Sequence, residues 1–290
     1  MTAPHRFWIR LCTLIVLLGF VASCGTLSIQ EEKQLGREVQ ASIRQQLTLL
    51  RDPVIVNYIR DMGERLVKAA PESPFDPKFY VVEGEDINAF AVPGGAIYIY
   101  TGLIAVSGNT AELAGVVAHE IGHVTLRHVA KSARRSRNVG FLAGLVRLAV
   151  MLTTGYDPWI VPGMVAQAYL APFSQEAEAE SDAQAVDTMI RAGFDPEGLA
   201  TMFETMKRES GGGFRMPQFL QTHPATDDRI KSVREEIARR GDLSALGLRL
   251  DDGGRLEIIQ ERLDYIVGTD VEDFEDEEEF DEENEEDDQN

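Results

Sequence analysis

Cysteine is scarce in this sequence of 290 residues, which holds only Cys12 and Cys24. Both lie near the N-terminus, so no disulfide framework can hold the fold, and its stability must come from core packing. The 44% share of hydrophobic residues is enough for one substantial core, which excludes disorder throughout the chain. The apolar run at 11–22 has about 12 residues, whereas a membrane-spanning helix needs about 20. A permanent transmembrane anchor is therefore disfavoured, with an uncleaved signal segment as the alternative.

Basic residues are also few, with 28 Lys and Arg against 48 Asp and Glu and a formal net charge of −20. Most of the excess lies in the tail, because residues 270–290 hold 15 acidic and no basic residues. The remainder of the chain carries only −5. It offers no sequence-wide basic surface that could release counterions from a polynucleotide, so nucleic acid is excluded as a partner.

The first residues have the pattern of an export signal: a short basic start, the apolar run and small residues before Cys24. The segment Val21-Ala22-Ser23-Cys24 resembles the lipobox of bacterial lipoproteins, in which the cysteine thiol receives a lipid. An ordinary cleavage site is the alternative. We predict an exported chain that is anchored to the lipid bilayer through Cys24. In a Gram-negative cell, Gly25 after the cysteine favours the periplasmic side of the outer membrane.

The spacing of apolar residues predicts helices around a small sheet. Between residues 28 and 70, apolar residues recur every four positions and predict two packing helices, divided near Pro53. Three prolines then break the chain, and the alternating segments Phe79–Val82 and Ala96–Tyr100 predict two strands joined by a glycine-rich bend. Start and stop signals downstream predict helices over about 109–131, 174–191, 195–208, 228–239 and 256–267.

The segment His119-Glu120-Ile121-Gly122-His123 has the spacing of a helical zinc site. Residues four apart on a helix project from one face, so both imidazoles can reach the same metal ion. Glu120 lies beside them and can accept a proton from a water molecule that the ion acidifies. The two histidines are half of the four that lie beyond the export signal. This spacing indicates a metal-dependent hydrolase.

A third protein ligand is needed, because catalytic zinc takes three and leaves one position open for water. Glu178 and Asp182 are four residues apart on a predicted helix, so both carboxylates share one face. Glu178 could complete the ligand set, and Asp182 could orient a ligand through a hydrogen bond. The alternative is a solvated acidic face, which Glu176 and Glu180 also fit.

Several further motifs accompany the histidine pair, in order, within residues 34–237. They are Asn88–Ala91 with Pro93-Gly94-Gly95, Thr101–Leu103, Glu178–Asp182, Ala192–Pro196 and Thr222-His223-Pro224. Through these motifs the chain resembles peptidase family M48, in the branch of the bacterial BepA, LoiP and HtpX proteases and the mitochondrial Oma proteases. The resemblance implies a gluzincin fold, one Zn²⁺ per chain and endoproteolysis of unfolded or membrane-associated envelope proteins. Envelope assembly factors are the implied partners.

The family motifs also imply a role for each residue that matches them. The resemblance implies that His119, His123 and Glu178 are the metal ligands and that Glu120 is the general base. It implies that Asp182 is a carboxylate that does not bind the metal but orients the residues that do.

Two matched residues each leave an alternative open. His223 matches a histidine that in some relatives occupies the fourth metal position and restrains activity; the alternative is a turn histidine before Pro224. Arg229 matches an arginine near the active site, where it could stabilise the oxyanion or pair with Asp182. One departure is Gln175, where relatives often carry arginine, and it puts a local ion pair in doubt.

Three other segments have structural as well as functional interpretations. His128 lies about 140° round the predicted helix from His123, so we expect it to pack in the core rather than bind the ion. Asn88–Gly95 precedes a strand that lies along the cleft in zincin-like sites, where a substrate could add as an extra strand; a plain turn is the alternative. Two apolar stretches within 139–171 could lie on a membrane, cover the cleft or form a buried hairpin.

Together these features predict an α+β fold, a helix-rich zincin of the gluzincin type with a small β-sheet. The predicted organisation is a signal peptide over 1–23, a lipidated N-terminus with helices over 24–70, a zinc metalloprotease domain over 71–241, an extension over 242–268 and a disordered acidic tail over 269–290. The predicted reaction is attack of water on a peptide bond polarised by zinc. A chaperone-like, non-proteolytic or latent zinc-binding envelope factor is one alternative, and Glu120 argues against it because binding needs no base. A module in which zinc is structural is the other.

Overall fold

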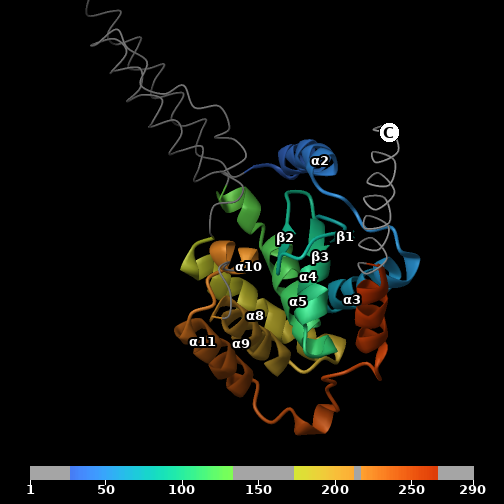
Figure 1. Ribbon diagram of the computed structural model, residues 1–290. Coiled ribbons are helices and arrows are strands. Elements are labelled where there is room, and N and C mark those ends of the chain that lie inside the picture. Colours follow the sequence, from blue (N-terminus) through green and yellow to red (C-terminus); the bar gives the residue numbers. More distant parts are fainter. Residues whose placement is uncertain (1–26, 133–172, 212–216, 267–290) are drawn as a thin grey trace, which may run out of the picture.

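The computed structural model describes residues 27–132, 173–211 and 217–266. Within these ranges the chain is rich in helices and holds one three-stranded sheet, so the predicted α+β class is confirmed (Figure 1). The named elements are α2 (Ile29–Gln46), α3 (Pro53–Ala69), β1 (Lys78–Val82), β2 (Ala89–Ala91), β3 (Ala96–Tyr100), α4 (Thr101–Val106), α5 (Thr110–Thr125), α8 (Gln175–Ala192), α9 (Glu197–Gly211), α10 (Gln218–Thr222), α11 (Asp227–Arg239) and η1 (Ser244–Leu246). A further helix covers 255–266.

The first two helices begin where the sequence places capping residues. Ser28 and Glu31 form a reciprocal capping box at the start of α2. At the start of α3, the Asp52 carboxylate accepts hydrogen bonds from two backbone N–H groups, and Pro53 occupies the first helical position. The Asp52 carboxylate also accepts two hydrogen bonds from Arg262, which ties the 255–266 helix to α3. The predicted helix pair is therefore confirmed.

The sheet has the order β1-β3-β2, with β3 parallel to β1 and antiparallel to β2. Every residue of β3 is buried, because α2 covers one face of the sheet and the main core covers the other (Figure 1). On the α2 side, Tyr98 stacks between Tyr80 and Phe90, each with ring centroids 5.1 Å away. The strand β2 lies in a segment for which the sequence predicted only a bend, because its three residues are too few to show an alternating pattern.

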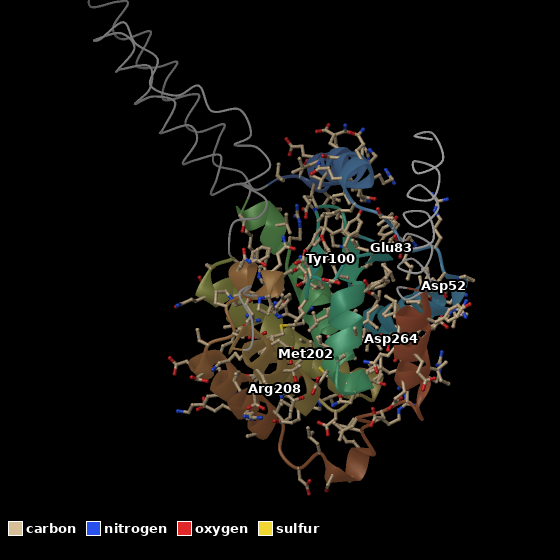
Figure 2. All side chains as sticks on the ribbon, in the orientation of Figure 1. Asp52, Glu83, Tyr100, Met202, Arg208 and Asp264 are labelled. Carbon is tan, nitrogen blue, oxygen red and sulfur yellow. The ribbon has the colours of Figure 1, made fainter. Side chains whose placement is uncertain are left out.

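Helix α5 runs through the middle of the molecule and is buried over nearly its whole length. The Asn109 side chain caps it, as the sequence predicts. It packs against α3, α8 and α9, whose apolar faces form the main core. Figure 2 shows this arrangement along α9, where Met202 points into the core while Arg208 lies on the surface.

One predicted helix is interrupted in the structure. The sequence predicts a single helix from 109 to about 131, whereas α5 ends at Thr125 and a turn separates it from helical residues 128–132. Arg127, in this turn, has a φ of 57°, a left-handed conformation that no α-helix can contain. Its side chain forms an ion pair with the buried Glu32 of α2 and donates to the Leu27 carbonyl. These tertiary contacts hold the turn, which is why a local pattern does not reveal it.

Most of the downstream helices match their predictions. Ser174 caps α8, and Gly193 ends it in the left-handed conformation with φ 76°. The predicted helices near 195–208, 228–239 and 256–267 correspond to α9, α11 and the 255–266 helix. The short helices α4 and α10 are not predicted, because one or two turns carry too little periodicity.

None of the helices within 27–132, 173–211 and 217–266 has the length and apolar character of a membrane span. The predictions for the signal peptide and Cys24, for the apolar stretches within 139–171 and for the acidic tail fall outside the described residues.

Candidate metal centre

Two histidines of α5 form the base of the site. His119 and His123 lie one helical turn apart and are fully buried, with their Nε2 atoms 2.9 Å from each other. This is the geometry that the four-residue spacing predicts. Burial, together with the neighbouring His119, holds the pKa of His123 well below its ordinary value. The ring is therefore neutral, which is the form that binds a metal.

Helix α8 and the loop after α10 each bring one more ligand atom to these histidines. The Glu178 carboxylate lies 3.4 Å from His123 Nε2 and 3.5 Å from His119 Nε2. His223 Nδ1 lies 3.3 Å from His119 Nε2 and 2.9 Å from Glu178 Oε1. Potential ligand atoms from the four residues all fall within 4.8 Å of one another, and all four side chains are buried.

The charge of this buried cluster favours a divalent cation. The residues Glu120, Glu178 and Asp182 are each at most 5% exposed, and the guanidinium of Arg229 is the buried cation beside them. Ionised, these three carboxylates would carry three negative charges against the one positive charge of Arg229. Burial of unpaired charge is costly, so a bound dication would remove a large penalty. Imidazole nitrogens with one carboxylate are a ligand set that suits zinc, so the residues fit the ion that the sequence predicts.

Asp182 contacts His119 at Nδ1, the ring nitrogen that faces away from the ligand cluster, and Asp182 itself forms an ion pair with Arg229. Asp182 Oδ1 lies 2.9 Å from His119 Nδ1, and the Arg229 guanidinium donates to both carboxylate oxygens at 2.7 and 2.8 Å. Burial raises the pKa of Asp182, but the charge and hydrogen bonds of Arg229 outweigh it and bring the pKa to about 2. The third guanidinium nitrogen of Arg229, Nη1, lies 2.6 Å from Glu178 Oε2. Of the two interpretations of Arg229, the geometry matches pairing with Asp182.

Glu120 lies on α5 beside the two histidines and is 1% exposed. Its carboxylate is 3.6 Å from His223 Nε2 and lies beside the Ala91 backbone of β2. Burial raises the pKa of Glu120, although His223 and His119 oppose the shift. A carboxylate beside the ligand cluster is placed to accept a proton there.

Two aromatic rings wall the cluster, and sequence reasoning missed both. Phe173 stacks on His123, with ring centroids 4.1 Å apart, and Phe219 stacks on His223 at 4.5 Å. Phe173 lies just before α8, and Phe219 lies in the short helix α10. Neither segment is long enough to show an apolar periodicity that would predict where its ring lies. Both aromatic rings restrict the orientations of the two imidazoles.

The turn at Arg127 also changes the place of His128. On a continuous helix His128 would point away from His123, whereas in the structure its Nδ1 lies 2.9 Å from His123 Nδ1. As the sequence predicts, His128 is buried and is absent from the group of potential ligands in the described residues. Its Nε2 lies 3.0 Å from Glu180 Oε2, so Glu180 is not simply part of a solvated acidic face. Histidine is rare in this chain, so a third histidine only five residues after His123 was the signal in the sequence that could have indicated this contact.

The small residue between the two histidines lets the ligand helices meet. A Cβ atom on Gly122 would lie 2.4 Å from Ser181 Oγ and 3.2 Å from the Ser181 backbone. Ser181 Oγ also donates to the His119 carbonyl at 2.6 Å. Close packing of α8 on α5 at this point brings Glu178 within reach of the histidines.

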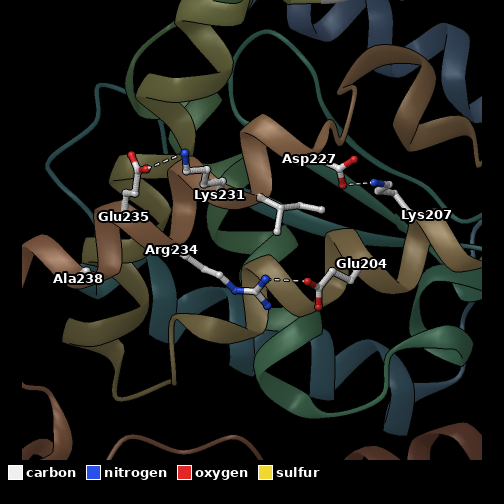
Figure 3. A pocket seen from close by; sticks show the side chains of 8 residues that line it. Glu204, Lys207, Asp227, Lys231, Arg234, Glu235 and Ala238 are labelled. Atoms are coloured by element: carbon white, nitrogen blue, oxygen red, sulfur yellow. Dashed lines mark hydrogen bonds and ion pairs between the residues drawn. The ribbon is translucent and has the colours of Figure 1, made fainter.

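A surface groove of about 610 Å³ lies apart from this cluster, between α9 and α11 (Figure 3). Its charged residues pair with one another: Lys207 with Asp227, Arg234 with Glu204, and Lys231 with Glu235. None of the residues that line the groove belongs to the ligand cluster, and we assign it no catalytic role.

Comparison with known proteins places this site in a family. Residues 56–237 match Peptidase family M48. The chain is 32% identical over 217 residues to the "Beta-barrel assembly-enhancing protease" of Escherichia coli K12, which covers 72% of this chain and 44% of the relative. It is 32% identical over 177 residues to "Metalloprotease LoiP" of the same organism, covering 58% of this chain and 65% of that protein. It is 27% identical over 178 residues to "Mitochondrial metalloendopeptidase OMA1" of Schizosaccharomyces pombe, covering 61% and 52%.

The chain thus spans less than half the length of the first of these relatives. The family match nevertheless covers more than half of this chain and includes His119, Glu120, His123, Glu178 and the other residues of the buried cluster. The chain belongs to peptidase family M48.

Proposed function

We propose that this chain is a zinc-dependent metalloendopeptidase that hydrolyses peptide bonds of misfolded or membrane-associated cell-envelope proteins. The observation that carries the proposal is the convergence of His119, His123 and Glu178 on one buried point, with Glu120 beside them. A binding module would need the ligands alone, whereas hydrolysis also needs a base.

The residues divide the catalytic work between them. His119, His123 and Glu178 would hold the zinc ion, which would supply an acidified water molecule and polarise the scissile carbonyl. Glu120 accepts the proton of the attacking water and delivers it to the leaving nitrogen. Asp182 accepts a hydrogen bond from the Nδ1–H of His119, which leaves Nε2 unprotonated and free as a ligand. Arg229 holds Asp182 and Glu178 in place through its ion pairs.

The sheet supplies a candidate docking edge for the substrate. Strand β2 lies at the end of the order β1-β3-β2 and packs against α5, which carries the histidines. An extended peptide could pair with the open side of β2 as a further strand. Main-chain hydrogen bonds of this kind recognise backbone rather than side chains, which is consistent with broad sequence preference.

Substrate class and location follow from the N-terminal pattern and from the relatives. The lipobox-like Cys24 supports an exported chain held at a membrane surface, on the periplasmic side of the outer membrane in a Gram-negative cell. The name of the Escherichia coli relative ties that protease to β-barrel assembly. We propose unfolded or membrane-associated envelope proteins as substrates of this chain, and envelope assembly factors as partners.

The first experiment combines metal analysis with a cleavage assay. Purified chain is expected to hold near one zinc per molecule and to cleave casein or an unfolded outer-membrane protein. Activity should disappear with a chelator and return with zinc. Zinc binding without cleavage would instead favour a chaperone-like factor, and absence of zinc would overturn the proposal.

His223→Ala is expected to raise peptide cleavage several-fold while zinc stays bound. His223 Nδ1 lies among the ligand atoms, so this side chain can fill the position that water needs. Three ligands remain after its removal. The test compares kcat and zinc content of the wild type and the variant, with His223→Gln as a variant that keeps a polar side chain. A variant that loses zinc together with activity would show that His223 is a required ligand rather than a restraint.

A further inference from the structure

We propose that His128 and Glu180 position the metal ligand His123 through a chain of two hydrogen bonds that ends on its Nδ1. This inference rests on the proposed function only in taking His123 as a metal ligand. His123 Nδ1 lies 2.9 Å from His128 Nδ1, and His128 Nε2 lies 3.0 Å from Glu180 Oε2. His128 is 1% exposed, so water does not compete freely for its ring nitrogens.

One arrangement of protons satisfies every contact in this chain. His123 Nε2 faces His119 and Glu178, so it must be unprotonated to bind a metal, and Nδ1 carries the proton. His123 Nδ1 then donates to His128 Nδ1. His128 in turn carries its own proton on Nε2 and donates it to the Glu180 carboxylate. The carboxylate therefore selects the tautomer of His128, and His128 selects the tautomer of His123.

The two ligand histidines of α5 are then supported in parallel ways. A carboxylate of α8, Asp182, contacts His119 Nδ1 directly at 2.9 Å. A second carboxylate of α8, Glu180, does not contact His123 directly. It contacts His128, which in turn contacts His123 Nδ1. Groups that accept the outer N–H of a ligand histidine fix its ring orientation and raise its basicity, and their loss typically costs about 10–100-fold in metal affinity.

The turn after α5 makes the contact geometrically accessible. Arg127 adopts φ 57°, which turns the chain so that His128 faces back toward His123. The Arg127 side chain is held by Glu32 and by the Leu27 carbonyl, so the turn is fixed from the N-terminal side of the fold. Lys131 also lies 3.4 Å from Glu180 and helps to hold that half-exposed carboxylate near His128.

Zinc affinity of the full chain, measured by competition with a chelating dye, tests this inference without substrate. His128→Phe fills similar space but removes both contacts, and we expect its zinc affinity to fall about 10–100-fold. His128→Asn keeps an oxygen that can accept from His123 Nδ1 and should restore much of that loss. Glu176→Ala changes the same charge on an exposed position of α8 and is the matched control for Glu180→Ala. We expect the control to leave affinity unchanged.

A double-mutant cycle separates positioning from a general structural role. Glu180→Ala should weaken zinc binding in the wild type and have no further effect in His128→Phe, because Glu180 acts through His128. The visible spectrum of the cobalt-loaded protein should shift in His128→Phe and stay constant in Glu176→Ala. If His128→Phe does not fold, the test rests on the two variants of α8. A loss of zinc affinity in Glu180→Ala but not in Glu176→Ala supports the inference. Equal zinc affinities of Glu180→Ala and Glu176→Ala overturn it.

Two results would overturn the inference outright. The first is a folded His128→Phe variant that binds zinc as tightly as the wild type. The second is an effect of Glu180→Ala that is equal with and without His128. Failure of the wild type to cleave peptides while it binds zinc would count against the proposed function alone.

Discussion

Glu120→Gln is expected to abolish measurable peptide cleavage while zinc stays bound at near one ion per chain. Glutamine keeps the size of the side chain and its place beside the ligands, but it cannot accept the proton of the attacking water. General acid–base groups contribute about 10²–10⁴-fold to rate, and here one residue both accepts and delivers the proton. Single-turnover cleavage of an unfolded protein substrate, measured together with zinc content, checks this prediction.

Glu176→Gln is the matched control for this variant, since Glu176 is exposed on α8 and lies outside the ligand cluster. It should cleave like the wild type. Undiminished cleavage by Glu120→Gln would remove Glu120 as the base. Loss of both zinc and cleavage would mean that the carboxylate is needed to build the site.

Arg229→Leu is expected to lower the free energy of unfolding of the metal-free protein by about 3–5 kcal/mol. The guanidinium is the buried cation that contacts both Asp182 and Glu178, and its removal leaves two buried carboxylates without a positive partner. The side chain also lies over the Phe203 ring, 4.4 Å from the centroid, so packing is lost as well. Urea denaturation with chelator present measures the change.

Arg234→Leu provides a control on the same helix. Arg234 forms ion pairs with Glu197 and Glu204 on the surface, and exposed pairs contribute only about 0–1 kcal/mol. Arg229→Lys keeps the charge but cannot make the two-pronged contact with Asp182, so we expect an intermediate loss. Equal destabilisation by Arg229→Leu and Arg234→Leu would contradict the importance of the buried network.

Much of the fold follows from local patterns in the sequence. Ser28, Asp52, Asn109 and Ser174 cap helices close to where the sequence predicts helix starts, because capping depends on hydrogen bonds within one turn. The apolar spacing of α2, α3 and α11 likewise follows from their one buried face. The strand β2 and the helices α4 and α10 were missed, because each is too short to show a period.

The candidate site divides in the same way. The i, i+4 spacing of His119 and His123 places two imidazoles on one face of α5 whatever surrounds the helix, and Glu120 comes with them. His128 shows the limit of this reasoning, since periodicity on an ideal helix points it away from His123. A left-handed residue at Arg127, held by Glu32 of α2, reverses that direction.

The sequence by itself determined the pair of histidines, the adjacent base and the helices that carry the site, because each depends on contacts within a few residues. The i, i+4 spacing of Glu178 and Asp182 and the family resemblance pointed to these two carboxylates of α8, but the spacing fits a solvated acidic face as well, and only the tertiary structure shows which carboxylates face the histidines. Glu178 and Asp182 face the histidines because α8 packs on α5 at Gly122, whereas Glu180 reaches them through His128. Arg229 and His223 join from α11 and the loop before it, more than a hundred residues after His119. Such contacts form when distant segments bury their apolar faces together, and no local pattern in the sequence specifies them.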